Sequence, residues 1–305
     1  MKLIFLGTSG CIPTKDRGLP ALLIKYLNNQ YLFDCGEGTQ RQMRLAGINF
    51  MRIDHIFITH LHADHFLGLG GLIQSMDFLE RTRTLNIYGP WGLKETMDHM
   101  LSMGTFRPDF LTLNIEEVEE GNVVEGDRFT VSCTRAEHTR NSLAYCFEEK
   151  SKRKFLKKKA LSLGVPEGHM FSRLQHGRSV EVDGKEVDPD DVLSDPIPGR
   201  KIVYSGDTRP CDSVTELATD ADILIHDATF SHEELEKTED AAHSTTKQAA
   251  EVAKKAKVKK LFLTHISQRY TNPLKLEEEA REVFPESYVA EDLLSVKVER
   301  HDIAE

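Results

Sequence analysis

The sequence lacks long apolar runs, paired cysteines and a leader-like start. No run in its 305 residues approaches the roughly 18 apolar residues that a membrane-spanning helix needs. The chain opens instead on a strand-like pattern, Lys2 to Leu6, without the shape of a cleavable signal. Its five cysteines are scattered, odd in number and contain no Cys-x-x-Cys pair, which is typical of reduced thiols. These absences predict a cytoplasmic protein that has no disulfide framework and no membrane partner.

The composition is that of a folded, acidic protein with one basic segment. Hydrophobic residues make up 39% of the chain and charged residues 29%, which suits one large or two small domains. The net charge of −10 argues weakly against a polyanionic partner. However, seven of the ten residues from Lys150 to Lys159 are basic, and Glu167 is the only acid between Lys150 and Arg178. Such an asymmetry indicates a segment that contacts a polyanion.

One short stretch, Thr-His-Leu-His-Ala-Asp-His, concentrates metal-binding side chains. It contains His60, His62, Asp64 and His65, and it follows a mostly apolar run, residues 53–58, that we expect to be a buried strand. In an extended loop, residues i and i+2 point the same way, so His60 and His62 can bind one ion. Asp64 and His65 follow the bend and can face a second ion. Imidazole nitrogens with carboxylate oxygens suit zinc first, with manganese or iron as alternatives.

The pattern His-x-His-x-Asp-His resembles the metallo-β-lactamase family, in which further ligands come from distant strand ends. His138, Asp207 and His265 each follow an apolar run, and Gly206 lets the backbone turn sharply before Asp207. The resemblance implies a hydrolase with two metal ions and a hydroxide between them. It assigns His60, His62 and His138 to one ion, Asp64, His65 and His265 to the other, and Asp207 to both.

The remaining chain alternates strand-like and helix-like stretches. We expect a hairpin across Asn28-Asn29 and an N-cap at Ser244 or Thr245. Strands are expected at residues 85–88, 111–115, 129–134, 143–147, 201–204, 223–225 and 260–263, and helices at residues 66–79, 91–103, 247–256 and 276–283. This order predicts an α/β (α+β) fold with two sheets packed together and helices outside, in αββα layers.

Residues 150–200 interrupt that pattern. They show little apolar periodicity and are rich in Gly, Pro, Lys and Asp. A structureless stretch of that length inside a compact domain is usually functional or mobile. We therefore expect one metallo-β-lactamase-like sandwich domain over residues 1–305, with residues 150–200 as an inserted, flexible basic arm.

The metal-binding pattern alone leaves the substrate open among phosphodiesters, thioesters, lactams and other esters. The arm favours RNA, because Lys and Arg side chains supply sequence-independent phosphate contacts. Structured RNA is recognised mainly through its shape and backbone. The arm therefore fits a folded RNA that is held away from the cut.

Five motifs resemble the tRNase Z family, whose members remove 3′ trailers from precursor tRNA, and they extend over almost the whole chain. They are Phe5-Leu6-Gly7-Thr8-Ser9, Pro13-Thr14-Lys15-Asp16-Arg17-Gly18, Phe33-Asp34-Cys35-Gly36-Glu37-Gly38-Thr39-Gln40, the arm motif at residues 163–168 with Gly177, and His226-Asp227-Ala228-Thr229 paired with His243-Ser244-Thr245. The last pair is the most specific. Two residues depart from the family pattern: Gly18 stands where asparagine is usual, and Asp227 where glutamate is usual.

The resemblance implies a zinc-dependent endoribonuclease that leaves a 3′-hydroxyl on the tRNA and a 5′-phosphate on the trailer. Asp64 would act as general base, and His243, steadied by Asp227, as general acid. The implied cofactors are two Zn²⁺ per subunit, and the implied partners are precursor tRNA and a second subunit, whose arm would hold the tRNA. The RNA-binding candidates are the basic residues of the second motif and of the arm, Lys15, Arg17, Lys150, Lys152, Arg153, Lys154, Lys157, Lys158 and Lys159.

Two other functions are alternatives. A small-molecule phosphodiesterase or thioesterase could use the same scaffold, although the basic arm and the two histidine motifs argue against it. A non-catalytic RNA-binding protein could use its metal ions for structure alone. Structural zinc sites are usually closed, four-coordinate and rich in cysteine, which this pattern is not.

Overall fold

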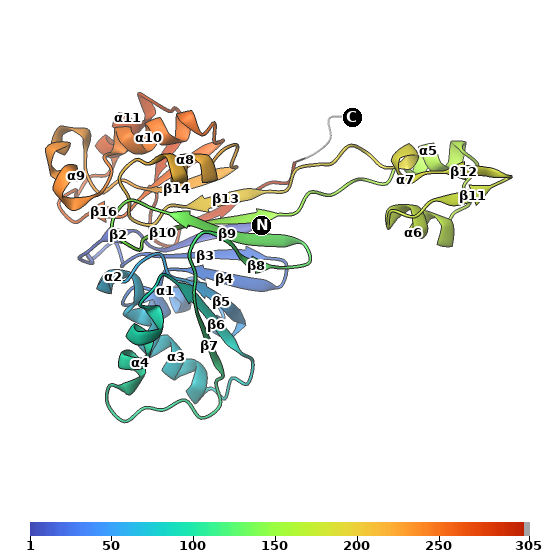
Figure 1. The fold of residues 1–305 in the computed structure, drawn as a ribbon. Helices are drawn as coiled ribbons and strands as arrows, with labels where there is room; N and C mark the ends of the chain where they lie inside the picture. Colours follow the sequence, from blue (N-terminus) through green and yellow to red (C-terminus); the bar gives the residue numbers. More distant parts are fainter. Residues whose placement is uncertain (302–305) are drawn as a thin grey trace. The chain divides into compact units, whose positions relative to one another are not determined.

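Two seven-stranded β-sheets form the centre of the larger of two compact units, which comprises residues 1–148 and 201–299. The structure is a computed structural model, and it describes residues 1–301. Figure 1 shows helices along the outer side of each sheet. The expected αββα order is therefore confirmed.

The first sheet is built mostly from the N-terminal half of the chain. Its strand order is β18-β1-β3-β4-β5-β6-β7, and β4 to β7 run parallel to one another. The turn of the β3–β4 hairpin lies one residue earlier than predicted, because Asn29 already pairs with Tyr26 and Leu27 has a φ of 53°. The strands are β1 (Lys2–Gly7), β3 (Ala21–Tyr26), β4 (Asn29–Phe33), β5 (Ile53–Phe57), β6 (Leu85–Gly89), β7 (Leu113–Glu117) and β18 (Ser295–Lys297).

The second sheet carries a run of parallel strands whose carboxyl ends lie at one edge. Its order is β17-β15-β14-β13-β10-β9-β8, and β13, β14, β15 and β17 are parallel. The short strands β2 (Ser9–Gly10) and β16 (Ile266–Ser267) pair in parallel beside this edge. The strands of the sheet are β8 (Gly121–Glu125), β9 (Phe129–Arg135), β10 (Leu143–Glu149), β13 (Lys201–Tyr204), β14 (Ile223–Asp227), β15 (Lys260–Thr264) and β17 (Ser287–Val289).

The helices confirm most of the predicted positions, with two differences. The helix expected at residues 66–79 is divided at Leu67, and α8 and α9 were not predicted. Thr245, rather than Ser244, caps α10 through a capping box with Gln248.

In the described residues, no helix is long and apolar enough to span a membrane. The helices of this unit are α1 (Thr39–Leu45), α2 (Ala63–Phe66), α3 (Gly68–Phe78), α4 (Leu93–Ser102), α8 (Asp212–Leu217), α9 (Glu236–Ala241), α10 (Thr246–Lys255) and α11 (Leu274–Arg281), with short 3₁₀ turns at Phe50–Arg52 and His232–Glu234.

Three apolar layers hold the sandwich together. Leu69 and Met97 belong to the layer between the first sheet and its helices. Phe33 and Tyr145, whose ring centroids are 6.0 Å apart, belong to the layer between the sheets. Ala249 belongs to the layer beneath α10. Because each sheet is covered on both faces, its strand ends are held rigidly, and loops that leave those ends can position side chains accurately.

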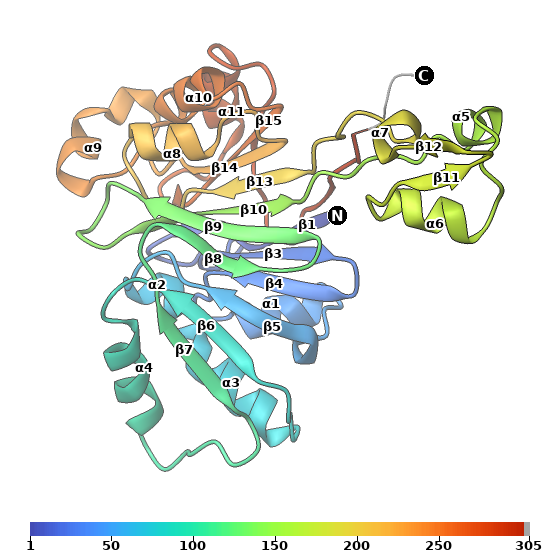
Figure 2. The ribbon, with the colours of Figure 1, turned by 45° about the vertical axis from the view of Figure 1, so that its right-hand side comes forward.

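The prediction that residues 150–200 are structureless is wrong. Residues 149–200, together with residues 300 and 301, form the second compact unit, whose helices and hairpin can be followed in Figure 2. Gly184, with a φ of 74°, lies in the turn of its hairpin. The elements of the arm were not predicted because each is too short to show periodicity and because its few core residues are widely spaced in the sequence. The elements are α5 (Lys157–Ser162), α6 (His169–Gln175), β11 (Val180–Val182), β12 (Lys185–Val187) and α7 (Pro189–Val192).

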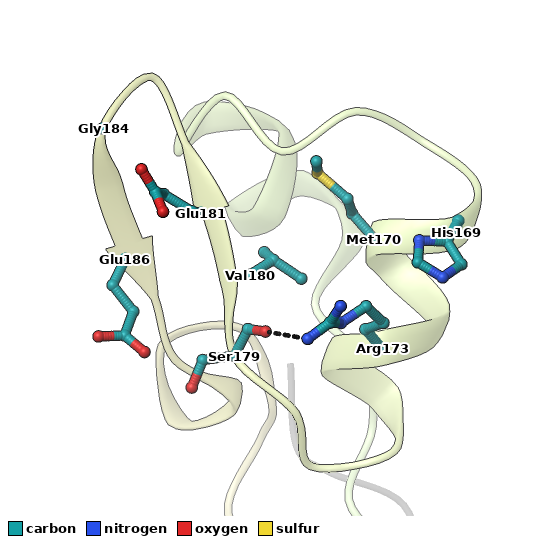
Figure 3. A pocket seen from close by; sticks show the side chains of 8 residues that line it. All are labelled: His169, Met170, Arg173, Ser179, Val180, Glu181, Gly184 and Glu186. Atoms are coloured by element: carbon teal, nitrogen blue, oxygen red, sulfur yellow. Dashed lines mark hydrogen bonds between the residues drawn. The ribbon is translucent and has the colours of Figure 1, made fainter.

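This second unit contains its own pocket, of about 680 Å³, between α6 and the β11–β12 hairpin (Figure 3). Arg173 lines the helix side and donates a hydrogen bond to the carbonyl oxygen of Ser179. Glu181 and Glu186 line the hairpin side. The arm therefore carries acidic as well as basic surface, and its positive charge is concentrated in its first part, near α5.

Replacement of Gly206 by alanine is expected to destabilise the sandwich strongly. Gly206 has a φ of 58°, and a Cβ there would lie 2.7 Å from the Cβ of Thr59, at the start of the histidine loop. Left-handed backbone costs a non-glycine residue about 1–2 kcal/mol, and the steric clash adds to that cost. Gly47→Ala is the matched control, because Gly47 has a φ of 63° but open space around it. Urea unfolding of both variants should show a clearly larger loss for Gly206→Ala; equal losses would mean that the Thr59 contact is unimportant.

Candidate metal centre

Ends of strands from both sheets meet around one group of histidines and carboxylates. His60 and His62 follow β5, and His138 follows β9. Asp207 follows β13, and His265 follows β15 directly. The carboxyl ends of the parallel strands β13, β14 and β15 share one sheet edge, so residues far apart in the sequence are brought within reach of common ions.

The first cluster consists of His60, His62, His138 and Asp207. His62 Nδ1 lies 3.0 Å from His60 Nε2 and 3.1 Å from His138 Nε2. A neutral imidazole carries only one N–H proton, so hydrogen bonds among these three rings cannot satisfy all three nitrogens. Zn–N bonds of 2.0–2.1 Å imply a tetrahedral edge of about 3.3 Å between ligands. The spacing of these nitrogens therefore fits the corners of a tetrahedral metal site.

The second cluster consists of Asp64, His65 and His265, again with Asp207. Asp64 Oδ2 lies 3.6 Å from His65 Nε2 and 3.4 Å from His265 Nε2. His65 Nε2 is fully buried and lies 3.3 Å from Asp207 Oδ2, yet it has no hydrogen-bond partner. An unsatisfied buried nitrogen aimed at two carboxylates is a position that a cation would satisfy.

Asp207 is placed between the two clusters. Its Oδ2 lies 3.2 Å from His265 Nε2, 3.6 Å from His60 Nε2 and 3.8 Å from His138 Nε2. Burial alone would raise the pKa of Asp207, but the surrounding imidazoles hold it well below its usual value. The carboxylate is therefore ionised and shared by both halves, as a bridging ligand would be.

Four of these imidazoles have their Nδ1 atom engaged outside the clusters. His60 donates from Nδ1 to Thr59 Oγ1, and His138 donates to the carbonyl oxygen of Ala242. His265 donates from Nδ1 to the hydroxyl of Thr229. His65 donates from Nδ1 to Asp34. Because Nδ1 of each ring is engaged with the protein, Nε2 is the nitrogen left to face the centre, which is the arrangement that metal-binding histidines require.

Asp34 holds this arrangement together, although it is not among the site residues predicted from the sequence. The carboxylate is fully buried and accepts hydrogen bonds from the backbone N–H and the hydroxyl of Thr59 and from the hydroxyl of Tyr204, besides that from His65 Nδ1 at 2.7 Å. One signal could have identified it. Asp34 directly follows a predicted apolar strand, as His265 does, and Asp207 comes three residues after another.

His243 and Asp227 form a second polar pair beside the centre. His243 Nδ1 donates to Asp227 Oδ2 at 2.6 Å, and the His243 ring lies 5.1 Å from that of His265. Burial lowers the pKa of His243, but the negative charge of Asp227 and this hydrogen bond more than offset it and raise the pKa to about 9. The ring is therefore protonated at neutral pH and can donate a proton.

Asp227 reaches His243 although it is one methylene shorter than glutamate. Its Oδ1 accepts from the backbone N–H and the hydroxyl of Thr229. Its Oδ2 accepts from the backbone N–H of Thr208 as well as from His243. Four donors hold the carboxylate in one orientation, and the shorter side chain is compatible with the pair.

The loop that carries Lys15 and Arg17 uses its two basic residues differently. Lys15 is exposed, with Asp16 3.8 Å away. Arg17 instead donates from one guanidinium nitrogen to Thr8 Oγ1 and to the carbonyl oxygen of Ala290, both at 2.6 Å. Arg17 therefore ties the loop to the sandwich, and Lys15 is the better placed of the two for an external phosphate.

Within the arm, two of the predicted RNA-binding residues are engaged with acidic neighbours. Arg153 pairs with Asp190 and donates to the carbonyl oxygen of Ser194. Lys157 lies 2.9 Å from Glu167. The other basic residues of this stretch are exposed, namely Lys150, Lys152, Lys154, Lys158 and Lys159.

Two protein-family models match the chain. A model described as "Beta-lactamase superfamily domain" matches residues 170–266, and one described as "Anti-Pycsar protein Apyc1" matches residues 1–156. The two matched ranges are separated by residues 157–169, within the arm. Together they include most strands of both sheets but not β17 and β18.

Individual relatives extend the likeness to nearly the full length. Ribonuclease Z of Methanothermobacter thermautotrophicus is 47% identical over 99% of this chain and 98% of its own. Ribonuclease Z of Methanosarcina acetivorans is 45% identical over 98% of both chains. The crystal structure of the short form of human tRNase Z superposes with a TM-score of 0.73 at 27% identity and covers 98% of this chain and 100% of its own.

Asp34→Asn should weaken metal binding without unfolding the protein. The amide cannot accept hydrogen bonds at both of its atoms, so His65 loses the anion that orients its ring. Changes to such supporting groups typically cost about 10–100-fold in metal affinity. Zinc titration against a competing chelator would measure the loss. Tyr204→Phe removes one donor to Asp34 but leaves the His65 contact, so a loss as large as that of Asp34→Asn would contradict the assignment.

Asp227→Asn should lower the pKa of His243 from its value of about 9 in the metal-free protein. The substitution removes the charge that favours the imidazolium, and burial, which opposes it, stays. An NMR titration of the His243 ring would follow the change. A pKa still near 9 would show that other groups, and not Asp227, keep the ring protonated.

Proposed function

The chain belongs to the ribonuclease Z family of the beta-lactamase superfamily, and we propose that it is a metal-dependent endoribonuclease that removes the 3′ trailer from precursor tRNA. The cut leaves a 3′-hydroxyl on the tRNA and a 5′-phosphate on the trailer. The observation that carries the proposal is the hydrogen bond from His243 Nδ1 to Asp227 Oδ2, which holds this ring beside the group of metal-binding side chains around Asp207. A structural metal site would need no proton donor at its side.

The proposed cofactors are two divalent ions, zinc in the first place and manganese or iron as alternatives. One ion would be held by His60, His62 and His138, the other by Asp64, His65 and His265, and both by Asp207. When bound, such a pair of ions lowers the pKa of water and polarises the scissile phosphate. The orphaned Nε2 of His65 and the close nitrogens of the first cluster support this assignment.

The proposed proton transfers use side chains on both sides of the scissile bond. Burial raises the pKa of Asp64, but His265 and His65 hold it well below its usual value, so the carboxylate is ionised. Asp64 would accept the proton of the attacking water as the new P–O bond forms. His243 would give its Nε2 proton to the departing 3′-oxygen as the old P–O bond breaks. Asp227 would keep the ring oriented and charged for that transfer.

The proposed RNA contacts lie on the Lys15 loop and on the arm. The exposed lysines of the arm supply positive charge to the phosphate backbone of a folded RNA. By the family resemblance, we further propose a homodimer in the cytoplasm, in which the arm of one subunit holds the tRNA that the other subunit cuts. Sedimentation of the protein with and without precursor tRNA would test the dimer.

The direct test of the proposed function is cleavage of a 3′-extended precursor tRNA. The proposal expects a single cut near the discriminator base, abolished by chelator and restored by zinc or manganese, with the expected end groups on both products. Absence of any cut, together with hydrolysis of a small phosphodiester, would favour a small-molecule hydrolase. RNA binding without any hydrolysis would favour a non-catalytic RNA-binding protein.

His243→Ala should reduce turnover of precursor tRNA by about 10²–10⁴-fold, the usual contribution of a general acid. The metal content should stay unchanged, because His243 belongs to the acid pair and not to the proposed ligands. Single-turnover kinetics and elemental analysis of the same preparation would measure both quantities. A variant that cuts at the wild-type rate would remove His243 from the mechanism.

Replacement of residues 151–198 by a short glycine linker should weaken binding of precursor tRNA at least about tenfold, because phosphate contacts of the arm are lost. The ends of the deletion are close, since Lys152 and Ile197 pair as in a strand ladder. Hydrolysis of a small phosphodiester is the control and should continue. The salt dependence of tRNA binding should also become shallower. Unchanged affinity and unchanged salt dependence would show that the arm is not an RNA-binding element.

A further inference from the structure

The loop that follows β2 places Cys11 beside the half of the candidate metal centre that contains Asp64 and His265. β2 pairs with β16, which follows His265 directly. A Cβ on Gly10 would lie 2.7 Å from the His265 ring, so glycine is needed for this close approach. The position of Cys11 is therefore tied to the position of a proposed metal ligand.

The strained backbone conformation of Cys11 brings its N–H group to a proposed metal ligand. Cys11 has a φ of 55°, in the left-handed region that residues with a Cβ rarely adopt. The conformation is held by hydrogen bonds from the Ile12 N–H to the Gly10 carbonyl and from the Ser9 hydroxyl to the Ile12 carbonyl. It directs the Cys11 N–H to Asp64 Oδ2 at 2.9 Å. Strain of this kind persists where surrounding structure demands it, often at functional sites.

The Cys11 side chain also faces this half of the centre. Its Sγ, an oxygen of Asp64 and a ring nitrogen of His265 all lie within 4.8 Å of one another. The same half contains His65 Nε2, which is completely buried and has no hydrogen-bond partner. A soft sulfur donor and an unsatisfied nitrogen thus face the same carboxylate.

We propose that Cys11 is an additional, thiolate ligand for a soft divalent ion held by Asp64, His65 and His265. The inference rests on the proposed metal centre and adds one donor to the ligands proposed above. When the ion binds, the S–H proton passes to solvent and a sulfur–metal bond forms, with no change of oxidation state. Because thiolates select soft ions, this half of the centre should favour cadmium or cobalt over manganese more strongly than nitrogen and oxygen ligands alone would.

The other cysteines provide a clear contrast. All five cysteines lie in the described part of the chain, and Cys11 alone among them is exposed. Cys211 is close in sequence to Asp207, but it is buried and its Sγ contacts the hydroxyls of Thr208 and Ser213. Cys211→Ser is therefore a matched control that removes a thiol near the centre but outside the proposed ligand set.

The test is cobalt substitution of the 305-residue protein after removal of other metals. Cobalt bound by a thiolate gives a near-ultraviolet sulfur-to-metal charge-transfer band, which nitrogen and oxygen ligands do not produce. The proposal expects this band in the wild-type protein and in Cys211→Ser, and its loss in Cys11→Ser and Cys11→Ala. Cadmium affinity should fall at least about tenfold in both Cys11 variants, whereas manganese affinity should stay within about twofold.

The outcomes separate this inference from the proposed function. Two cobalt ions bound without a charge-transfer band would refute the thiolate ligand and leave the metal centre intact. A band that persists in Cys11→Ala would assign the sulfur to another residue and also refute the inference. Failure to bind cobalt, zinc or manganese at all would overturn both the ligand and the metal centre.

Discussion

The structure depends on a concentration of buried imidazoles and carboxylates that only cations can fully satisfy. Asp207 is 3% exposed and has four histidine nitrogens within 3.8 Å. Burying ionisable groups is costly unless they are paired or bind metal. The parallel strands β13, β14 and β15 impose this convergence, because their carboxyl ends share an edge. The fold thus positions the ligands, and bound metal is expected to stabilise the fold in return.

Around that centre, hydrogen bonds to the histidine rings determine which ring nitrogen faces inward. Asp34, Thr59, Thr229 and the Ala242 carbonyl each engage the Nδ1 atom of a histidine, which leaves Nε2 for a metal ion. Thr229 also donates to Asp227, so the same hydroxyl connects a proposed metal ligand to the acid pair. The metal centre and the proton donor are therefore parts of one hydrogen-bonded network, which explains how a protonated imidazole is kept close to proposed cations.

Much of the site could be predicted from the sequence because its residues come shortly after apolar strands. The histidine loop, His138, Asp207 and His265 all show that signal, and the αββα layers follow from the order of elements. Burial and partners could not be predicted in the same way. Arg17 and Arg153 were predicted to bind RNA because arginine side chains commonly contact phosphates. In the structure, their guanidinium groups donate hydrogen bonds to oxygen atoms of the protein itself. The arm folds around a core of side chains too few and too dispersed to show periodicity.

The most direct test of the central claim is to locate the metal ions in a crystal of the zinc-loaded protein by anomalous scattering at the zinc edge. The account predicts two peaks in each chain, one coordinated by His60, His62 and His138 and the other by Asp64, His65 and His265, with Asp207 binding both. A single peak, or peaks away from these side chains, would contradict the claim that the strand ends form a two-metal hydrolytic centre.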